Sequence, residues 1–215
     1  CDADVDALLT AVAGVPAGAS ANSLRVPGFT AGMALDRFMQ AGLTAASGAV
    51  AVSGASGAVG MLATAILSRA GWQVCALTRK PEQADALRAL GASEILDAAV
   101  VNAPPRALEK ARFAAAIDNV GGATLAWLLR STQEGGCVAS VGNAAGNSFD
   151  GSVLPFIMRG IQHFGVVANA PWPVRERVWG HLGTDWRPSF EALGPHVRQI
   201  ALDALPAHAS AQLDG

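Results

Sequence analysis

The segment Val50 to Gly60, VAVSGASGAVG, constrains the fold more than any other part of the sequence. Its first three residues predict a short buried strand, and the residues from Met61 to Ala70 place apolar side chains at helical spacing. Gly54, Gly57 and Gly60 therefore fall in a turn from a strand to a helix. In that context the first glycine allows a tight turn, the second lets a pyrophosphate approach the main chain, and the third lets the helix pack on the strand. The alternative is an ordinary glycine-rich turn.

Unpaired N–H groups and the positive end of the helix dipole would face phosphates at this turn. A P-loop is excluded because it needs a lysine after the last glycine, where Met61 stands. A nucleophile elbow centred on Ser56 would need a glycine at Ala58. Ser56 is therefore expected to be a turn residue that can also donate to a phosphate. The expected phosphate contacts are Ser56, Gly57, Ala58, Val59 and Gly60.

Strand-like runs recur at regular intervals, with helical patterns between them. They are Ala49 to Ser53, Gln73 to Leu77, Glu94 to Leu96, Ala114 to Asp118, Cys137 to Val141 and Phe164 to Val167. Alternation of this kind is typical of a parallel sheet with helices on both faces. We therefore predict an α/β fold, a doubly wound parallel (Rossmann) sheet of about six strands.

The chain divides into three expected parts. They are an N-terminal helix (Asp4 to Val12) and connecting segment over 1–27, the dinucleotide-binding domain over 28–170, which starts with a helix over Phe29 to Ala41, and a C-terminal helical segment over 171–215, truncated before a final strand. Trp179 and Trp186 in the last part are expected to pack against the sheet rather than bind a ligand. Because the chain starts at Cys1 without methionine, we interpret it as a piece of a longer polypeptide.

Composition excludes several classes of partner. The formal net charge of -2 provides no basic field for nucleic acid. No charged residue occurs from Phe38 to Ser68, but glycines and serines interrupt this stretch, so a buried strand between two helices explains it better than a membrane span. The three cysteines, Cys1, Cys75 and Cys137, are far apart and form neither a metal cluster nor a disulfide framework, which fits a reducing cytoplasm.

The end of the second predicted strand indicates which dinucleotide would bind. A unit that binds NAD usually has an acidic residue there to hold the ribose 2′-hydroxyl. No Asp or Glu occurs between Asp36 and Glu82; instead the strand ends in Thr78, Arg79 and Lys80. A 2′-phosphate would pair with the two cations, so these three residues are expected to select NADPH. The alternative is that Arg79 and Lys80 are two solvated cations at the surface.

Two catalytic arrangements are excluded by their missing residues. The chain has no tyrosine, so a Tyr-Lys proton relay cannot operate in it. The four histidines show no spacing that would bring three ligands to one catalytic zinc. No catalytic residue and no metal ligand is therefore assigned, and what the residues themselves indicate is a shelf for the cofactor.

Several motifs together resemble one known group, the acrylyl-coenzyme A reductases within the zinc-independent quinone oxidoreductase branch of the medium-chain dehydrogenase/reductase superfamily. The motifs are Pro16 to Ser20, Gly28 to Ala31, Ser53 to Gly60, Leu90 to Ser93, Ala116 to Gly121, Gly135 to Gly142 and Val153 to Arg159. The resemblance runs from about Val15 to the end of the chain. It implies an NADPH-dependent reductase of activated double bonds, in a quinone, an acrylyl-CoA or another enoyl thioester.

The resemblance also implies further cofactor contacts. Asn143 and Ile157 would lie near the nicotinamide half, Asn119 and Thr30 would border the cofactor cleft, and Arg159 would help to orient the cofactor. In two places this chain departs from the family pattern. Ala98 follows Asp97 where the family often has an arginine that helps to hold the adenosine phosphate, and Val26-Pro27 replaces small residues.

Family members have an N-terminal barrel-like domain that supplies much of the substrate cleft, and this chain lacks it. We therefore expect the chain alone to be incomplete as an enzyme, with a small-molecule substrate, no nucleic acid or membrane partner, and a homodimer formed along the sixth strand, Gln162 to Val167. Two other interpretations stay open. The chain could be a non-catalytic nucleotide-binding module of a larger protein, or the enoylreductase section of a multidomain synthase, and the length of the parent reading frame would separate them.

Overall fold

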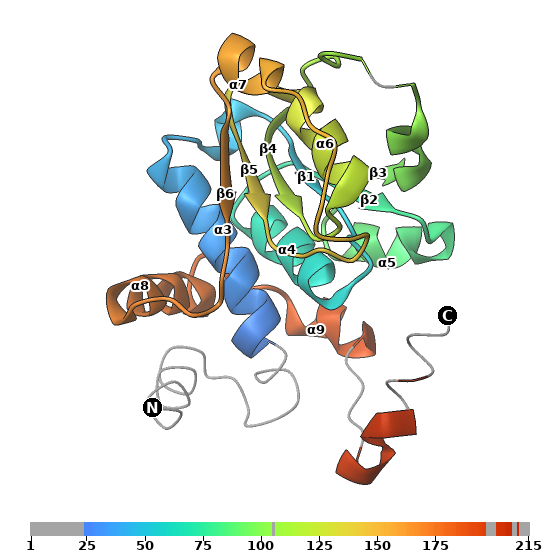
Figure 1. The fold of residues 1–215 in the computed structure, drawn as a ribbon. Coiled ribbons are helices and arrows are strands. Elements are labelled where there is room, and N and C mark those ends of the chain that lie inside the picture. Colours follow the sequence, from blue (N-terminus) through green and yellow to red (C-terminus); the bar gives the residue numbers. More distant parts are fainter. Residues whose placement is uncertain (1–23, 105, 197–200, 208–209, 211–215) are drawn as a thin grey trace.

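The computed structural model describes residues 24–104, 106–196, 201–207 and 210. A single sheet of six parallel strands, in the order β3-β2-β1-β4-β5-β6, forms its centre (Figure 1). The strands are β1 (Val50–Val52), β2 (Val74–Thr78), β3 (Glu94–Asp97), β4 (Phe113–Asp118), β5 (Thr132–Ser140) and β6 (Gln162–Gly165). This order confirms the predicted doubly wound fold. The helix expected over Asp4 to Val12 lies outside the described residues.

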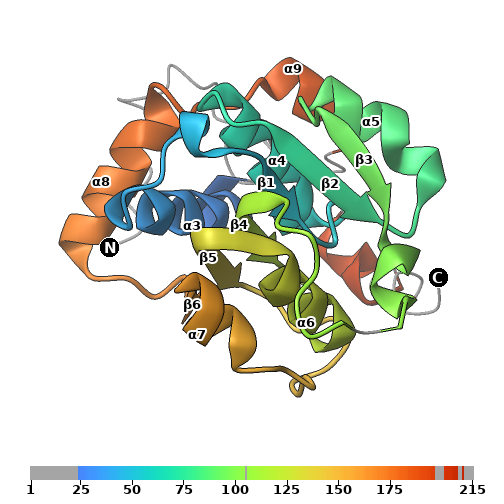
Figure 2. The ribbon, with the colours of Figure 1, turned by 90° about the horizontal axis from the view of Figure 1, so that it is seen from above.

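Helices cover both faces of the sheet (Figures 1 and 2). The α-helices are α3 (Phe29–Gln40), α4 (Ala58–Arg69), α5 (Ala84–Ala89), α6 (Gly122–Ser131), α7 (Leu154–Arg159), α8 (Trp172–Gly183) and α9 (Phe190–Leu193). The short turns are η1 (Leu24–Gly28), η2 (Ala45–Ser47), η3 (Pro81–Gln83), η4 (Ala98–Asn102), η5 (Gly194–His196) and η6 (Leu202–Ala204). Helices α3, α4 and α5 share one hydrophobic core with one face of the sheet, and α6 packs on the other face.

Strand β1 is buried on both sides. Val50 and Val52 face the core that α3 and α4 share, whereas Ala51 faces the core under α6. All three side chains are inaccessible to solvent, as expected for a central strand of a parallel sheet. The uncharged run over 38–68 is thus a buried strand flanked by helices. Across the described residues, no helix has both the length and the apolar character that a membrane crossing requires.

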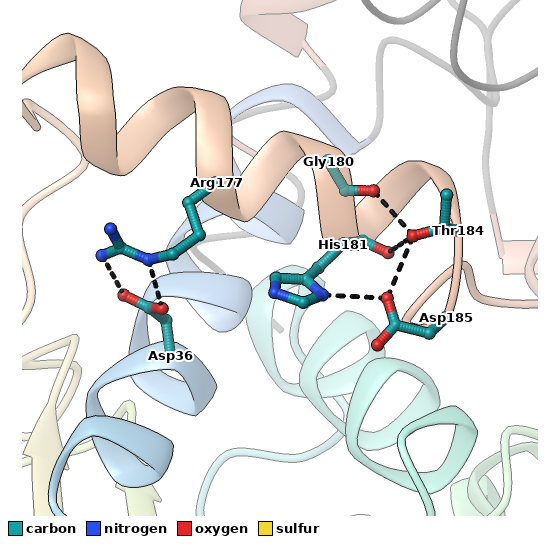
Figure 3. A network of polar contacts seen from close by, with 6 residues as sticks. All are labelled: Asp36, Arg177, Gly180, His181, Thr184 and Asp185. Atoms are coloured by element: carbon teal, nitrogen blue, oxygen red, sulfur yellow. Dashed lines mark hydrogen bonds and ion pairs between the residues drawn. The ribbon is translucent and has the colours of Figure 1, made fainter.

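Helix α8 packs on α3 and holds it against the sheet. The ring of Trp179 stacks on that of Phe29, with centroids 5.4 Å apart. Arg177 donates from Nε and Nη2 to the two carboxylate oxygens of Asp36, at 2.8 Å each, as Figure 3 shows. Asp36 and Trp179 are buried, and so is Trp186. Both tryptophans, predicted to pack against the sheet, belong to the hydrophobic core that the sheet shares with α3 and α4, and Trp179 packs there on α3.

A second group of polar contacts in Figure 3 closes the end of α8. The His181 ring stacks on Trp186 with centroids 4.2 Å apart, and its Nδ1 lies 2.9 Å from a carboxylate oxygen of Asp185. The hydroxyl of Thr184 donates to the carbonyl of Gly180 at 2.8 Å. These contacts end the helix with its last polar groups paired.

All six strands differ from their predicted bounds by at least one residue, and β5 and β6 differ most. Strand β5 starts at Thr132 rather than at Cys137, because Thr132 pairs with Phe113 before the register shifts. Gly135, at a φ of +69°, lies in the irregular part and interrupts the apolar pattern that sequence analysis relies on. Strand β6 starts two residues earlier than Phe164. Strand β5 thus extends beyond its apolar run, whereas β6 is shifted, since it also ends at Gly165, two residues before the predicted Val167.

Candidate cofactor-binding site

All six strands run in one direction, so the loops that follow them meet at one edge of the sheet, the lower edge in Figure 1. Strand β1 lies between β2 and β4, so the strands that follow it in the chain are added first on one side of β1 and then on the other. Ligands of open α/β sheets bind at such a switch point, outside the carboxyl ends of the strands. The predicted site residues can therefore be judged by whether they reach this edge.

The three glycines after β1 have separate structural roles. Gly54 has a φ of +56°, which a residue with a side chain adopts only at a cost. A Cβ on Gly60 would lie 2.3 Å from the Gly54 carbonyl oxygen, so only glycine lets α4 start this close to the turn. Gly57 is exposed, has a φ of -84°, and a Cβ there would come no closer than 3.3 Å to that same oxygen. The fold itself therefore requires Gly54 and Gly60 more than it requires Gly57.

The amino end of α4 carries N–H groups that no side chain caps. Gly57 is the N-cap residue and provides no capping hydrogen bond, while the N–H groups of Ala58, Val59 and Gly60 belong to the first turn, which precedes the intrahelical ladder. The ladder begins with Met61, whose N–H donates to the Gly57 carbonyl at 2.8 Å. Free amides and a positive helix dipole together make a site for an anion.

The end of β2 lies directly beside this turn. The hydroxyl of Thr78 donates to Ser56 Oγ at 3.2 Å and accepts a hydrogen bond from the Lys80 N–H at 3.0 Å. Thr78 is buried, whereas Arg79 and Lys80 are exposed. The structure thus brings the glycine turn and the segment with the two cations together.

The loop after β4 is tied to the first residue of the glycine turn. Asn119 donates from its main-chain N–H to Ser53 Oγ at 3.0 Å and from Nδ2 to the Ser53 carbonyl at 2.7 Å. The remaining side-chain atom, Asn119 Oδ1, is buried and has no donor. Such an atom is costly unless a ligand or water satisfies it.

Sequence analysis missed two residues at this edge, Ser53 and Asp118. Ser53 Oγ donates to a carboxylate oxygen of Asp118 at 2.6 Å, and both residues are buried. Burial raises the pKa of the Asp118 carboxyl above its ordinary value, although the hydrogen bond from Ser53 acts in the opposite direction. The available sequence clue was a polar residue at the end of each of two otherwise apolar strands.

The loop after β5 packs on the loop after β4. The Ala145 N–H donates to the Val120 carbonyl at 2.7 Å, and Asn143 is exposed, with its Nδ2 donating to Asn147 Oδ1. Thr30 begins α3 at the lower end of the molecule in Figure 1, where its hydroxyl donates to the Val26 carbonyl at 2.7 Å. The preceding turn, η1, contacts α4. Asn143 and Thr30 therefore lie at the same end of the sheet as the glycine turn.

Ile157 and Arg159 lie at the opposite end. Both belong to α7, which directly precedes β6, so they are at the amino ends of the strands. Arg159 donates from Nη1 to the carbonyl of Thr132, the first residue of β5, at 2.8 Å, and also binds the carbonyls of Arg130 and Glu109. The expectation that Arg159 orients the cofactor is wrong, because its guanidinium fastens α7 to the amino end of β5. Ile157, on the same helix, is likewise left out of the candidate site.

Comparison with protein families now gives these features a context. Residues 58–181 match the family described as zinc-binding dehydrogenase. The chain belongs to this family. It corresponds to the nucleotide-binding part of the medium-chain dehydrogenases/reductases, the superfamily that the sequence motifs indicated. Across the described residues, no three His, Cys, Asp or Glu side chains come together as a metal site.

Individual relatives agree with this assignment. The chain is 39% identical over 181 residues to the acrylyl-CoA reductase AcuI of Ruegeria pomeroyi, covering 83% of this chain and 54% of AcuI. It is 38% identical over the same length to YhfP of Bacillus subtilis, which is named a quinone oxidoreductase. The solved yhdH oxidoreductase of Salmonella enterica, in complex with NADP, superposes with a TM-score of 0.84 at 35% identity, over 89% of this chain and 59% of that one. The B. subtilis YhfP structure holds NAD. This chain therefore spans little more than half the length of these relatives.

Proposed function

We propose that this chain is the NADPH-binding part of an oxidoreductase that reduces the activated carbon–carbon double bond of a quinone, an acrylyl-CoA or another enoyl thioester. The observation that carries the proposal is the uncapped amino end of α4, which lies beside two exposed cations, Arg79 and Lys80. When bound, NADPH supplies the hydride that such a reduction needs. The names and bound cofactors of the relatives support the same activity.

The residues at the carboxyl edge fit the two halves of this cofactor. The free first-turn amides of Ala58, Val59 and Gly60 would bind the pyrophosphate. Gly57, whose own N–H donates to the Gly54 carbonyl at 2.9 Å, would let the pyrophosphate approach the main chain, and Ser56 would add a hydroxyl donor. Thr78 would support Arg79 and Lys80 as they hold the 2′-phosphate. On the other side of the switch point, the nicotinamide half would lie among the residues Thr30, Asn119 and Asn143. The unsatisfied Asn119 Oδ1 could accept an N–H donor there.

The proposed chemistry does not depend on zinc, in spite of the family name. A catalytic zinc needs about three converging protein ligands. His163 lies on β6 and bonds Ser140, while His181 closes α8 and pairs with Asp185. The two side chains are thus engaged in separate parts of the fold, which supports a site without metal.

We also propose a cytoplasmic location, a substrate-binding domain supplied by the rest of the parent protein, and a homodimer.

The decisive experiment compares NADPH with NADH by calorimetric titration. Two charge-assisted contacts to a 2′-phosphate should favour NADPH by roughly 2 to 4 kcal/mol. The double substitution Arg79→Ala/Lys80→Ala should abolish this preference without harming the fold. A matched control removes two exposed cations that precede β3 and β4, Arg88 and Lys110, and should keep the preference. Equal binding of NADH and NADPH by the wild-type chain would contradict the proposal.

A second measurement tests whether the chain is only part of an enzyme. Hydride transfer needs donor and acceptor atoms held at about 3 to 3.5 Å in a cleft that excludes water. We expect the chain alone to bind NADPH yet not oxidise it with acrylyl-CoA or a quinone at about one turnover per second, an ordinary enzymatic rate. Turnover at that rate by the purified chain would show that no further domain is needed.

A further inference from the structure

Asp118 is the last residue of β4 and is completely buried. Its carboxylate accepts three hydrogen bonds: from Ser53 Oγ at 2.6 Å, from the Val120 N–H at 3.2 Å and from the Gly121 N–H at 2.9 Å. Ser53 follows β1, whereas Val120 and Gly121 form the turn between β4 and α6. One carboxylate therefore fixes two of the loops at the carboxyl edge.

The main chain of Asp118 fixes a third loop. Its carbonyl oxygen accepts hydrogen bonds from the N–H groups of Val141, at 2.8 Å, and Gly142, at 3.1 Å, the first two residues after β5. Space is also limited here, since a Cβ on Gly142 would lie 2.6 Å from the Asn119 carbonyl oxygen. The backbone that leads to Asn143 is thereby held against the loop that carries Asn119.

The adenosine side of the candidate site is held by different contacts. Thr78 bonds Ser56 and Lys80, and the Ala55 N–H donates to the Leu77 carbonyl at 3.0 Å. None of these bonds includes Asp118. The two networks share no residue, although they meet in the glycine turn at Ser53 and Ala55. A change at Asp118 should therefore affect the nicotinamide side more than the adenosine side.

A buried carboxylate is a costly way to pack a loop. Burial raises the pKa of Asp118, which means that its ionised form is destabilised in the folded protein. His163 on β6 acts in the opposite direction by its charge, and its ring is bonded to Ser140 rather than to Asp118. Among the described residues, no ion pair includes Asp118. Groups kept at such a cost are expected where a site needs their geometry.

We propose that Asp118 is a positioning residue for the nicotinamide half of the cofactor. It acts through Asn119 and Asn143, whose loops it joins to the end of β1. This inference rests on the proposed function, because it needs the chain to bind NADPH. A role in packing alone would destabilise the protein but would not distinguish one end of the cofactor from the other.

The test compares two ligands on the intact chain: NADPH, and 2′-phospho-ADP-ribose, which has the same phosphates but no nicotinamide. Wild-type protein should bind NADPH more tightly than the fragment. In Asp118→Asn, one amide N–H would face the main-chain donors, so the loops should loosen. We expect the dissociation constant of NADPH to rise about tenfold and that of the fragment to stay within about twofold. The change in dihydronicotinamide fluorescence on binding should also be lost.

The matched control is Asp97→Asn, the same change of charge at the end of β3. Asp97 is exposed, pairs with Thr78 across the strands, and accepts a hydrogen bond from the Ala99 N–H at 2.8 Å. Because it lies on the adenosine side, it should shift both ligands together. Ser53→Ala removes one donor to Asp118 and also the acceptor of the Asn119 N–H, and it keeps the two main-chain bonds to Asp118. It should reproduce the selective loss if Asp118→Asn does not fold.

The possible results separate the two proposals. If wild-type protein binds neither ligand, the proposed function and this inference both fail. If it binds both, but equally well, or if Asp118→Asn alters both ligands alike or neither, the inference is overturned and the proposed function stands. The inference is also overturned if neither Asp118→Asn nor Ser53→Ala folds, since the role is then structural.

Discussion

Gly57 and Gly60 lie in the same turn but lack side chains for different reasons, which a pair of substitutions should separate. A Cβ at position 60 would lie 2.3 Å from the Gly54 carbonyl oxygen and 2.6 Å from the Ala55 Cα, so Gly60→Ala should cost about 1 to 3 kcal/mol of unfolding free energy through overpacking. Gly57→Val should leave the fold intact yet abolish NADPH binding, because its side chain would cover the free amides. Urea denaturation and calorimetric titration measure the two effects; NADPH binding by Gly57→Val would remove the turn from the proposed site.

The Asp118 carboxyl should leave a signature in the pH dependence of stability. Burial raises its pKa above the ordinary 3.8, so the folded state holds this proton more tightly than the unfolded state does. The stabilisation is then fully present below about pH 3.8 and is lost as the pH rises through the folded pKa. Relative to Asp118→Asn, the wild-type protein should therefore lose unfolding free energy with rising pH. Urea denaturation of both proteins from about pH 4 to about pH 8 tests this, and parallel curves would contradict it.

Sequence spacing was sufficient to predict part of the site and insufficient for the rest. The glycine turn and the cations after it were predictable because each is a local pattern, a strand followed by a turn and a helix. The Ser53 to Asp118 hydrogen bond joins residues 65 positions apart. It exists because β4 lies next to β1 in the sheet, and no local pattern specifies that neighbour.

Among whole elements, helix α8 matters to the site through α3, which carries Thr30 at its amino end. Asp36 on α3 is 8% exposed at its side chain and receives both bonds from Arg177, which is 42% exposed. Arg177→Met keeps the aliphatic stem but leaves this buried carboxylate with only the Gln40 amide. Because solvent screens the partly exposed Arg177 side of the ion pair, we expect Arg177→Met to lose about 1 to 2 kcal/mol of unfolding free energy.

A double-mutant cycle tests whether this loss comes from the ion pair. The double variant Asp36→Asn/Arg177→Met should lose less unfolding free energy than the two single variants lose in sum. Each single change already breaks the ion pair, so the other change cannot break it again. Glu176→Gln, an exposed position next to Arg177, is the control and should change stability by no more than about 0.5 kcal/mol. Additive costs would show that α8 is held by apolar packing, chiefly Trp179 on Phe29, and that the ion pair contributes nothing.

Helix α7 shows where element-level prediction from sequence ends. The segment from Val153 to Arg159 was recognised only as a motif of the family resemblance, and the structure shows that it forms α7. It did not indicate that the chain returns from the carboxyl end of β5 to the amino end of the sheet before β6 starts. Because β6 runs parallel to β5, the chain must return to the amino end of the sheet before β6 starts. Ile157 and Arg159 therefore lie at the opposite end of the strands from the glycine turn.

At the scale of the whole molecule, β6 is the edge strand that a second copy could extend. It is last in the sheet order, and Gln162, His163 and Gly165 are exposed. Helix α8 packs on α3, so Trp179 on α8 and Trp186 after it face the core and leave this edge uncovered. Next to the edge, α7 exposes Ile157 at 71% and Met158 at 63%. An open strand edge beside exposed apolar side chains favours association.

We therefore expect light scattering to find a homodimer at tens of micromolar protein, an order of magnitude suited to a modest interface. Met158→Glu would place a charge in the apolar surface beside β6, so it should shift the equilibrium to monomer while the unfolding free energy of the monomer stays nearly unchanged. Val26→Glu is the matched control, because Val26 is 63% exposed in η1, which contacts α3 and α4, and it should leave the dimer intact. If Met158→Glu stays dimeric, the interface lies elsewhere. A wild-type monomer at this concentration would show that an open edge and exposed apolar side chains are too little for self-association, and that the surface is available to the remainder of the parent protein.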